Sequence, residues 1–313
     1  MKKDILQNIW VIALLAFFCC ALWGSAFSAV KTGYALLHIE NDAWADQLTF
    51  GGLRFAAAGI MALAAGSIMQ KKLLLPHRGA FRKIGIISFY QTIAQYFCYY
   101  IGLAHTSGVK ASVLVGANVF LAIFISGALF HLEKITARKI IGSVIGFSGI
   151  ILINLSGLRS GLRFNFLGDG MILLCTVASG FSSASMKKLS VGEDPVMLSG
   201  WQFFFGGIVL MLIGLLGGGH IPHFTPRTFL LMLYLSFISA AAYSVWAILL
   251  KHNPVSRVSV FGFLNPVCGV AISALVLHER SQINLSFVFA LLLVCAGIIT
   301  VNYLPKQKQN TRS

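Results

Sequence analysis

Long apolar stretches separated by short polar breaks run along the whole chain. We find ten of them, each about 19–24 residues long: 9–30, 46–69, 83–103, 108–130, 137–155, 166–186, 196–217, 227–250, 256–277 and 283–303. At 1.5 Å per residue, a helix of about 20 residues crosses a hydrocarbon core of about 30 Å. Lipid offers no hydrogen-bond partner to backbone amides, so each stretch is predicted to be helical. The pattern therefore predicts an all-α polytopic membrane protein with ten transmembrane helices.

The two halves of the chain resemble each other. Placing residues 94–131 above residues 241–278, 147 positions later, aligns Tyr96 with Tyr243, His105 with His252, Ser112 with Ser259, Asn118 with Asn265, Ser126 with Ser273 and His131 with His278. We therefore divide the chain into residues 1–160 and 161–313, with five spans in each half. Because five is odd, the second half enters the membrane from the opposite face. This predicts two inverted five-helix repeats, an architecture that places the solute site near the midplane between the halves.

Composition agrees with a membrane protein. Hydrophobic residues make up 57% of the 313 residues and charged residues 11%, whereas a soluble domain carries about 25% charged residues. The net charge of +15 comes from short breaks without interleaved aromatics, so we expect the bilayer and no nucleic acid as a partner. The six cysteines lie in apolar stretches without Cys-x-x-Cys spacing. We expect neither disulfides nor a metal site nor a cofactor.

The distribution of Lys and Arg predicts the orientation. With a cytoplasmic N-terminus, only six of these residues fall in outer segments: Lys31, Lys110, Arg159, Arg163, Arg227 and Arg280. Most of the others fall in inner segments, as the positive-inside rule requires. We therefore expect both termini to be cytoplasmic and the protein to lie in the inner (plasma) membrane. The first span resembles a signal peptide, but it matches the sixth span, so we expect it to belong to the fold.

Several motifs occur in a fixed order along the chain. They are Trp23-Gly-Ser-Ala-Phe27, Leu53-Arg54-Phe55, Ala111-Ser112, Glu133 followed by Thr136, and Gly142, Gly146 and Gly149. Together with the duplication they resemble the EamA-type transporters of the drug/metabolite transporter superfamily. The resemblance implies a secondary carrier whose central cavity is formed by spans 1–4 and 6–9, with spans 5 and 10 as scaffold. The family pattern has a proline in spans 4 and 9, but here only Asn265 is followed by one, Pro266, whereas Val119 follows Asn118.

Arg54 is a candidate substrate-binding residue. It lies about 12 Å deep in the second span, where an unpaired charge facing lipid is costly. We interpret it as facing the cavity and pairing with a substrate carboxylate. Two alternatives are that it snorkels to the outer surface or that it caps a carbonyl of a neighbouring helix. Its counterpart in the second half, Gln202, is neutral.

Polar and aromatic side chains supply the other candidates. They are Gln91, Gln95, Tyr99, Tyr243 and Trp246 in spans 3 and 8, Asn118 and Asn265 in spans 4 and 9, and Trp23, Trp201 and Gln202. Four-residue spacing places Gln91, Gln95 and Tyr99 on one helix face. Such a face suits a cavity wall for neutral, zwitterionic or quaternary-ammonium ligands. The alternatives are an interfacial aromatic belt and, for the asparagines, hydrogen bonds between helices.

These features predict a secondary transporter of a small neutral or zwitterionic metabolite, an amino acid or a related compound, working as an exporter. A membrane-embedded enzyme or a channel is the alternative, but no zinc-protease, nucleophile-elbow or ion-filter pattern occurs. We expect Glu133 and Glu279 to be structural and to pair with nearby Lys134, Arg138 or Arg280. Gly142 and Gly146 indicate close helix packing, either internal or within a homodimer.

Overall fold

The computed structural model describes residues 2–40, 42–106, 111, 114–153, 155, 164–276 and 285–303. Its elements are α1 (Lys2–Gln7), α2 (Ile9–Leu37), α3 (Trp44–Gln70), α4 (Ala80–Ser88), η1 (Phe89–Ala94), α5 (Gln95–His105), α7 (Asn118–Phe124), η2 (Ile125–Leu129), α8 (Ala137–Ile153), η3 (Phe166–Gly170), α10 (Met171–Leu189), α11 (Pro195–Leu216), α12 (Pro226–His252), α13 (Val255–Ser259), η4 (Val260–Phe263), α14 (Leu264–Val276) and α15 (Leu285–Asn302). Every one of these elements is a helix, so the predicted all-α class is confirmed.

Six helical segments within the described ranges are long and apolar enough to cross a membrane: Ile9–Ala26, Trp44–Gln70, Phe166–Leu189, Pro195–Leu216, Pro226–His252 and Leu285–Asn302. A shorter apolar segment covers Leu114–Leu129. The protein is therefore a multi-pass membrane protein. Two of these helices begin at prolines: Asp194 caps α11 ahead of Pro195, and Thr225 and Thr228 form a capping box ahead of Pro226.

Four of the predicted spans contain irregular helix, and in residues 166–189 it is the π-helix η3 ahead of α10. Residues 80–105 run as α4, the π-helix η1 and α5. Residues 255–276 contain the 3-10 helix η4 just before Pro266, which has no N–H to continue a regular ladder. The matching span without a proline is also interrupted, because a turn at Ala117 precedes α7 and the π-helix η2 follows it. A missing proline therefore does not make this span regular.

Two helix pairs make the most extensive contacts, α3 with α11 and α8 with α15. Glycines allow both approaches. A Cβ added at Gly207 would lie 2.3 Å from the Ala56 nitrogen, and one at Gly297 would lie 2.6 Å from both the Gly142 oxygen and the Gly146 nitrogen. The predicted packing at Gly142 and Gly146 is therefore internal, against α15.

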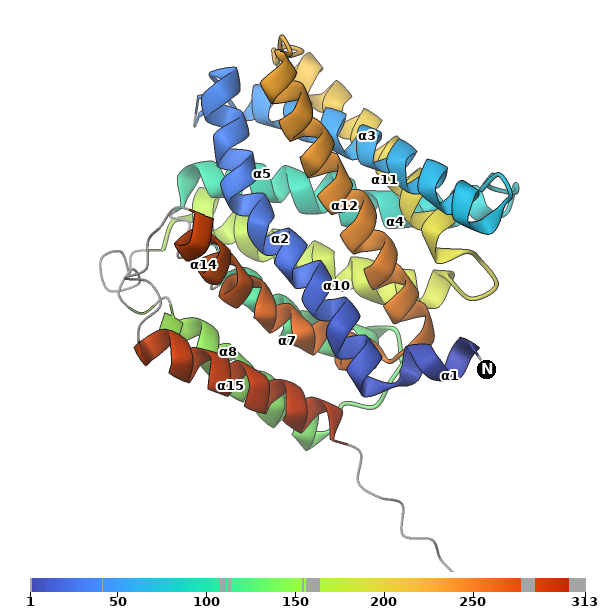
Figure 1. Ribbon diagram of the computed structural model, residues 1–313, viewed down its shortest axis with the longest axis vertical. Helices are drawn as coiled ribbons and strands as arrows, with labels where there is room; N and C mark the ends of the chain where they lie inside the picture. Colours follow the sequence, from blue (N-terminus) through green and yellow to red (C-terminus); the bar gives the residue numbers. More distant parts are fainter. Residues whose placement is uncertain are drawn as a thin grey trace, which may run out of the picture.

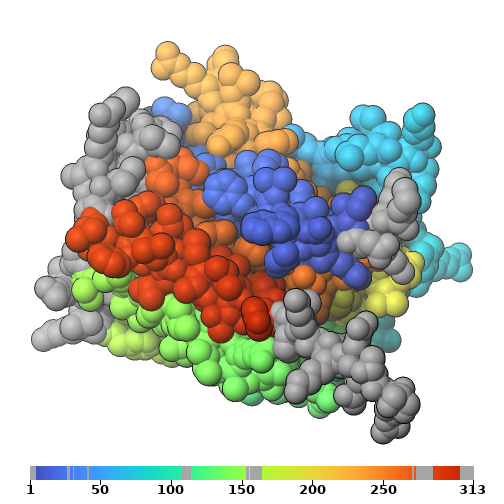
Figure 2. Space-filling model, turned by 60° about the horizontal axis from the view of Figure 1, so that its bottom comes forward, coloured from blue at the N-terminus to red at the C-terminus, as the bar shows by residue number. Residues whose placement is uncertain are grey.

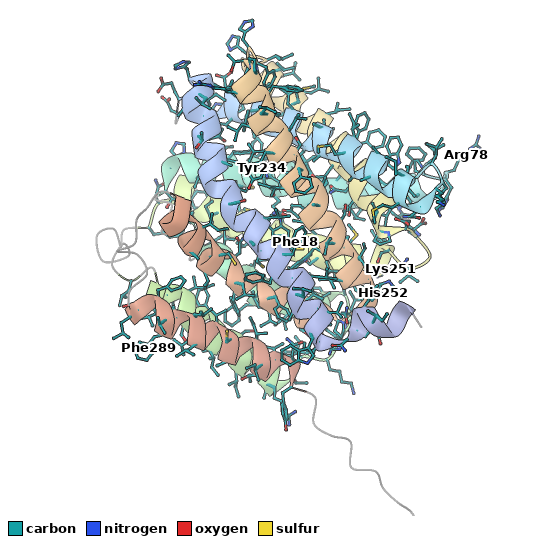
Figure 3. All side chains as sticks on the ribbon, viewed as in Figure 1. Phe18, Arg78, Tyr234, Lys251, His252 and Phe289 are labelled. Carbon is teal, nitrogen blue, oxygen red and sulfur yellow. The ribbon has the colours of Figure 1, made fainter. Side chains whose placement is uncertain are left out.

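The two pairs lie at opposite edges of the molecule, with α2 and α12 crossing between them (Figure 1). A view of the lower edge shows α15 and α8 side by side on the surface (Figure 2). Large apolar side chains such as Phe18 and Phe289 are exposed on the outside of the bundle (Figure 3). In a bilayer these side chains contact lipid, whereas the buried centre is free to hold polar groups.

Candidate functional site

Aromatic rings from α2, α3, α5, α11 and α12 meet inside the bundle. We call Trp23, Phe55, Tyr96, Phe203, Tyr243 and Trp246 the central aromatic cluster. The Trp23 ring lies 5.0 Å from both Tyr243 and Trp246, edge to face. Phe55 stacks on Phe203 at 5.3 Å and contacts Tyr96 at 4.2 Å. The structure therefore brings together the candidates Trp23, Tyr243 and Trp246.

Two tyrosines hydrogen-bond to each other in this cluster. The hydroxyls of Tyr96 and Tyr243 are 2.7 Å apart, and the residues are separated by 147 positions, the offset that aligns the two halves. Phe203 packs on Tyr243 at 5.0 Å, and Gln95 interacts with the Tyr243 hydroxyl. Residues that match in the sequence thus touch at the centre. The repeat alignment pairs Tyr96 with Tyr243, but Tyr96, Phe55 and Phe203 are not among the predicted site residues.

Arg54 is buried beside this cluster, with 4% of its surface exposed. Its Nε donates to the Leu235 carbonyl at 3.3 Å, and Nη2 donates to the Ser239 hydroxyl at 3.0 Å. The alternative that Arg54 caps a carbonyl of a neighbouring helix is confirmed by the Leu235 contact. Its burial is inconsistent with snorkelling to the outer surface.

The guanidinium is a buried positive charge without a carboxylate partner among the described side chains. Its electrostatic neighbours are phenols, those of Tyr34, Tyr96, Tyr99, Tyr100 and Tyr243. Phenols are weak counterparts for a cation in a low-dielectric site. This charge therefore favours an anionic group at the centre, and its role in binding substrate remains a prediction.

Gln91 and Gln202 lie where η1 packs against α11. Gln202 is fully buried, and its Oε1 accepts a 2.7 Å hydrogen bond from Thr92, while its Nε2 has no partner. Gln91 is also buried, and its Oε1 has no partner. The π-helix η1 widens the turn between Gln91 and Gln95, so Gln91 is rotated from the straight face that regular helix spacing predicts.

Asn118 and Asn265 begin regular helix after the irregular turns of their spans, at the first residue of α7 and the second residue of α14. Both are half-buried, and each amide oxygen is buried without a partner. An unpaired buried polar group costs about 1–3 kcal/mol. The Trp23 Nε1 is likewise buried without a hydrogen-bond partner. These groups can bind the polar parts of a solute.

Trp201 lies elsewhere. Its Nε1 donates to the Leu74 carbonyl at 2.8 Å, and its ring stacks on Phe205 at 5.4 Å. Neither partner belongs to the central aromatic cluster. The structure therefore does not bring Trp201 together with the other candidates.

Glu133 has a different ion-pair partner from the ones predicted. Its Oε2 lies 2.6 Å from Lys139 Nζ rather than beside Lys134 or Arg138. Lys139 is in the first turn of α8, where its stem reaches back over the preceding loop. The matched Glu279 and Arg280 lie outside the described residues.

Glu133 also joins helices that are far apart in the sequence. Its carboxylate accepts hydrogen bonds from the Ser126 hydroxyl at 2.8 Å, from the Ser256 backbone N–H at 2.8 Å and from the Ser256 hydroxyl. Burial raises the pKa of this carboxyl, but the hydrogen bonds from Lys139, Ser256 and Ser126 outweigh it, so the pKa lies below its usual value. Glu133 is therefore ionised and tied into the structure at neutral pH.

Within the described parts of the chain, no group of three His, Cys, Asp or Glu side chains could hold a metal ion. His220 instead contacts Asp46, with Nδ1 3.3 Å from Oδ1. The described cysteines are all free.

A bundle of apolar helices with aromatic, amide and cationic side chains buried at its centre is the arrangement of a polytopic membrane transporter. The sequence profile of the EamA-like transporter family matches residues 10–155 and again residues 166–303. The chain therefore belongs to the EamA-like transporter family.

Individual relatives agree with this assignment. The uncharacterized transporter YvbV of Bacillus subtilis (strain 168) is 24% identical over 294 residues, which cover 93% of this chain and 91% of the relative. The uncharacterized inner membrane transporter YedA of Escherichia coli (strain K12) is 27% identical over 292 residues, 88% of each chain. One crystal structure with 16% identity matches the fold with a TM-score of 0.75 and covers 93% of this chain and 96% of that one.

Proposed function

We propose that this protein is a secondary transporter that exports a small neutral or zwitterionic metabolite, an amino acid or a related compound. The observation that carries the proposal is the hydrogen bond between Tyr96 and Tyr243. Two residues at equivalent positions of a repeat meet only close to the axis that relates the halves. That axis therefore passes through the central aromatic cluster, where a transporter of this kind binds its solute.

In this proposal the chain crosses the membrane ten times as two inverted five-helix halves, residues 1–160 and 161–313, with both termini in the cytoplasm. The stacking of Phe55 on Phe203 and the packing of α3 on α11 support a division into two structurally related halves. So does the family profile, which matches each half separately. Two similar halves of opposite orientation have two packings of similar energy, one open to each side, and exchange between them moves the solute.

The proposed site recognises both ends of a zwitterion. Arg54 supplies the positive charge for a carboxylate. The faces of Trp23, Tyr243 and Trp246 suit an ammonium group through cation–π contact. The unpaired amide oxygens of Asn118 and Asn265 can accept hydrogen bonds from the same group.

The test is flux through purified protein in liposomes, with amino acids, aromatic cations and nucleobases competing for uptake. Arg54→Gln introduces at position 54 the side chain that its repeat counterpart Gln202 already has. The fold therefore already accommodates a side chain of this shape at the equivalent position. We expect this variant to lose at least tenfold in transport of carboxylate-bearing solutes, since a desolvated charge pair contributes about 2–5 kcal/mol. Transport of solutes without a carboxylate should change much less.

The matched control is Arg257→Gln, which removes a half-buried arginine of α13 outside the central cluster. Normal flux of carboxylates through folded Arg54→Gln protein would contradict the anchoring role. Absence of flux for every solute class in the wild-type protein would contradict the transporter itself.

A further inference from the structure

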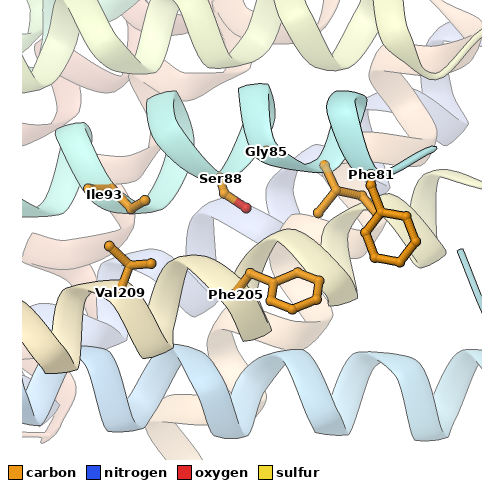
Figure 4. Close-up of a pocket in the computed structure, with 7 residues that line it drawn as sticks. Phe81, Gly85, Ser88, Ile93, Phe205 and Val209 are labelled. Atoms are coloured by element: carbon orange, nitrogen blue, oxygen red, sulfur yellow. The ribbon is translucent and has the colours of Figure 1, made fainter. Parts of the chain in front are cut away.

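An apolar groove lies between α4, η1 and α11, away from the central cluster (Figure 4). Its volume is about 290 Å³. Phe81 lies near one end and Ile93 at the other, with Phe205 and Val209 on the opposite wall. Its length follows the axis of α4, so it fits an extended chain better than a compact solute.

The groove is open because of Gly85. A Cβ added at this position would meet no atom within 4 Å. The one polar side chain of the lining, Ser88, donates its hydroxyl to the Gln202 carbonyl at 3.0 Å. A bound molecule therefore meets an apolar surface and has no lining hydroxyl left to satisfy.

Positive charge lies at the Phe81 end of this groove. Arg82 directly follows Phe81, and Arg78 lies in the turn before α4; both are exposed. Arg78 projects from this end of the molecule in Figure 3. Lys83 is already paired with Glu193 at 2.7 Å, and the first turn of α4 contains no acidic residue. Arg78 and Arg82 are therefore available to an external anion.

We propose that this groove binds a bilayer phospholipid with an acidic headgroup, with one acyl chain between α4 and α11 and the phosphate against Arg78 and Arg82. The apolar lining accounts for the chain, and the two arginines account for the preference in headgroup. Basic residues at the membrane surface attract anionic lipids in this way. Lipid binding in this groove does not rest on the proposed transport.

The experiment is native mass spectrometry of the purified protein titrated with phosphatidylglycerol or phosphatidylcholine. We expect the wild-type protein to retain phosphatidylglycerol preferentially. The double variant Arg78→Gln, Arg82→Gln should weaken its retention by roughly tenfold or more, because each basic residue contributes at the surface. The matched control Lys71→Gln, Lys72→Gln removes the same charge from the end of α3 and should change retention less than about twofold.

Gly85→Leu tests the acyl-chain part separately. A Cβ at this position has open space around it, so folded protein is expected, and the leucine side chain occupies the groove, so retention of both lipids should fall. Equal retention of the two lipids by wild-type protein, or full retention by Gly85→Leu, would overturn the proposal. A protein dimer that is present in the wild type and absent in Gly85→Leu would also overturn the proposal, because the groove would then be occupied by a second copy of the protein.

Discussion

The α3–α11 pair and the α8–α15 pair are built in the same way but contain different side chains. Each pair joins matching stretches of the two halves, and each packs backbone against backbone through glycine. Gly207 lies against the Ala56 nitrogen in the first pair, and Gly297 lies against Gly142 and Gly146 in the second. Packing alone therefore does not distinguish a functional interface from a scaffold.

What distinguishes them is the polar content. The α3–α11 pair carries Arg54 and Gln202, both buried, and its rings Phe55 and Phe203 stack beside the tyrosine pair. Among the described residues of α8 and α15, the buried polar side chain is Ser143. Buried polar groups in a membrane protein are costly and are kept where they serve a function. The comparison teaches that close helix packing supports both regions, and it favours the first pair as the place of the proposed solute site.

The largest expected effect tests what the two pairs share. Gly207→Leu and Gly297→Leu each place a side chain within 2.6 Å of backbone atoms, which cannot move aside as a side chain can. Overpacking costs about 1–3 kcal/mol and occasionally more, so we expect both variants to fail to yield folded protein. The measurement is the yield of monodisperse protein and its unfolding temperature. Gly85→Leu is the control, since it makes the same substitution in open space.

If either variant folded as well as Gly85→Leu, the corresponding helices would not be held by close backbone contact. A difference between the two variants would show that one pair tolerates separation, as a moving interface must. The two helix pairs would then differ in mobility as well as in polar content.

A smaller effect is expected where the two regions are joined. Glu133 bonds to Lys139 of α8 and to Ser256 of α13, so it ties the peripheral pair to the rest of the bundle. Hydrogen bonds to charged groups contribute about 1.5–3 kcal/mol, and Glu133→Gln should lower the free energy of unfolding by about that amount. Glu40→Gln, at an exposed position, is the control.

The stabilisation by Glu133 is expected to decrease at low pH. The folded pKa of Glu133 is lower than the usual 4.5, so its ionised form stabilises the folded state. This contribution is fully present above about pH 4.5 and is lost as the pH falls through the lowered value. The difference between wild type and Glu133→Gln, measured by unfolding at several pH values, should therefore shrink below pH 4.5. A difference that stays constant down to pH 3 would exclude the carboxylate as its source.

Much of this arrangement could be predicted from the sequence. The apolar stretches predicted the helices because lipid requires a closed backbone ladder. The repeat aligned Tyr96 with Tyr243 in the sequence, and the structure adds that their hydroxyls touch. Residue type made Tyr243 and Trp246 candidates, and both lie in the central aromatic cluster.

Contacts between distant parts of the chain could not be predicted in the same way. Spacing could not reveal that Ser256, 123 positions away, binds Glu133. The π-helix η1, which rotates Gln91, leaves no clear mark in residue types. Trp201 is of a residue type that is common in binding sites, but its position on α11 directs its side chain toward Leu74. Orientation around a helix axis is set by tertiary packing, which a local pattern does not encode.

The smallest expected effect separates the two regions most cleanly. Gln91 and Ser143 are both buried, and each has a polar atom without a partner. Removing an unpaired buried polar group is neutral or stabilising by up to about 1 kcal/mol. We therefore expect Gln91→Leu and Ser143→Ala to unfold at the same temperature as wild-type protein or slightly higher.

Transport should distinguish the two variants. Gln91 is a predicted site residue, so Gln91→Leu should reduce liposome flux several-fold while the protein stays folded, as expected when a site sacrifices stability for function. Ser143 lies in the peripheral pair, and Ser143→Ala should leave flux unchanged. Equal flux in both variants would remove Gln91 from the site. Reduced flux in Ser143→Ala alone would place the moving interface at α8, because a helix that only supports the bundle has no step in transport to lose.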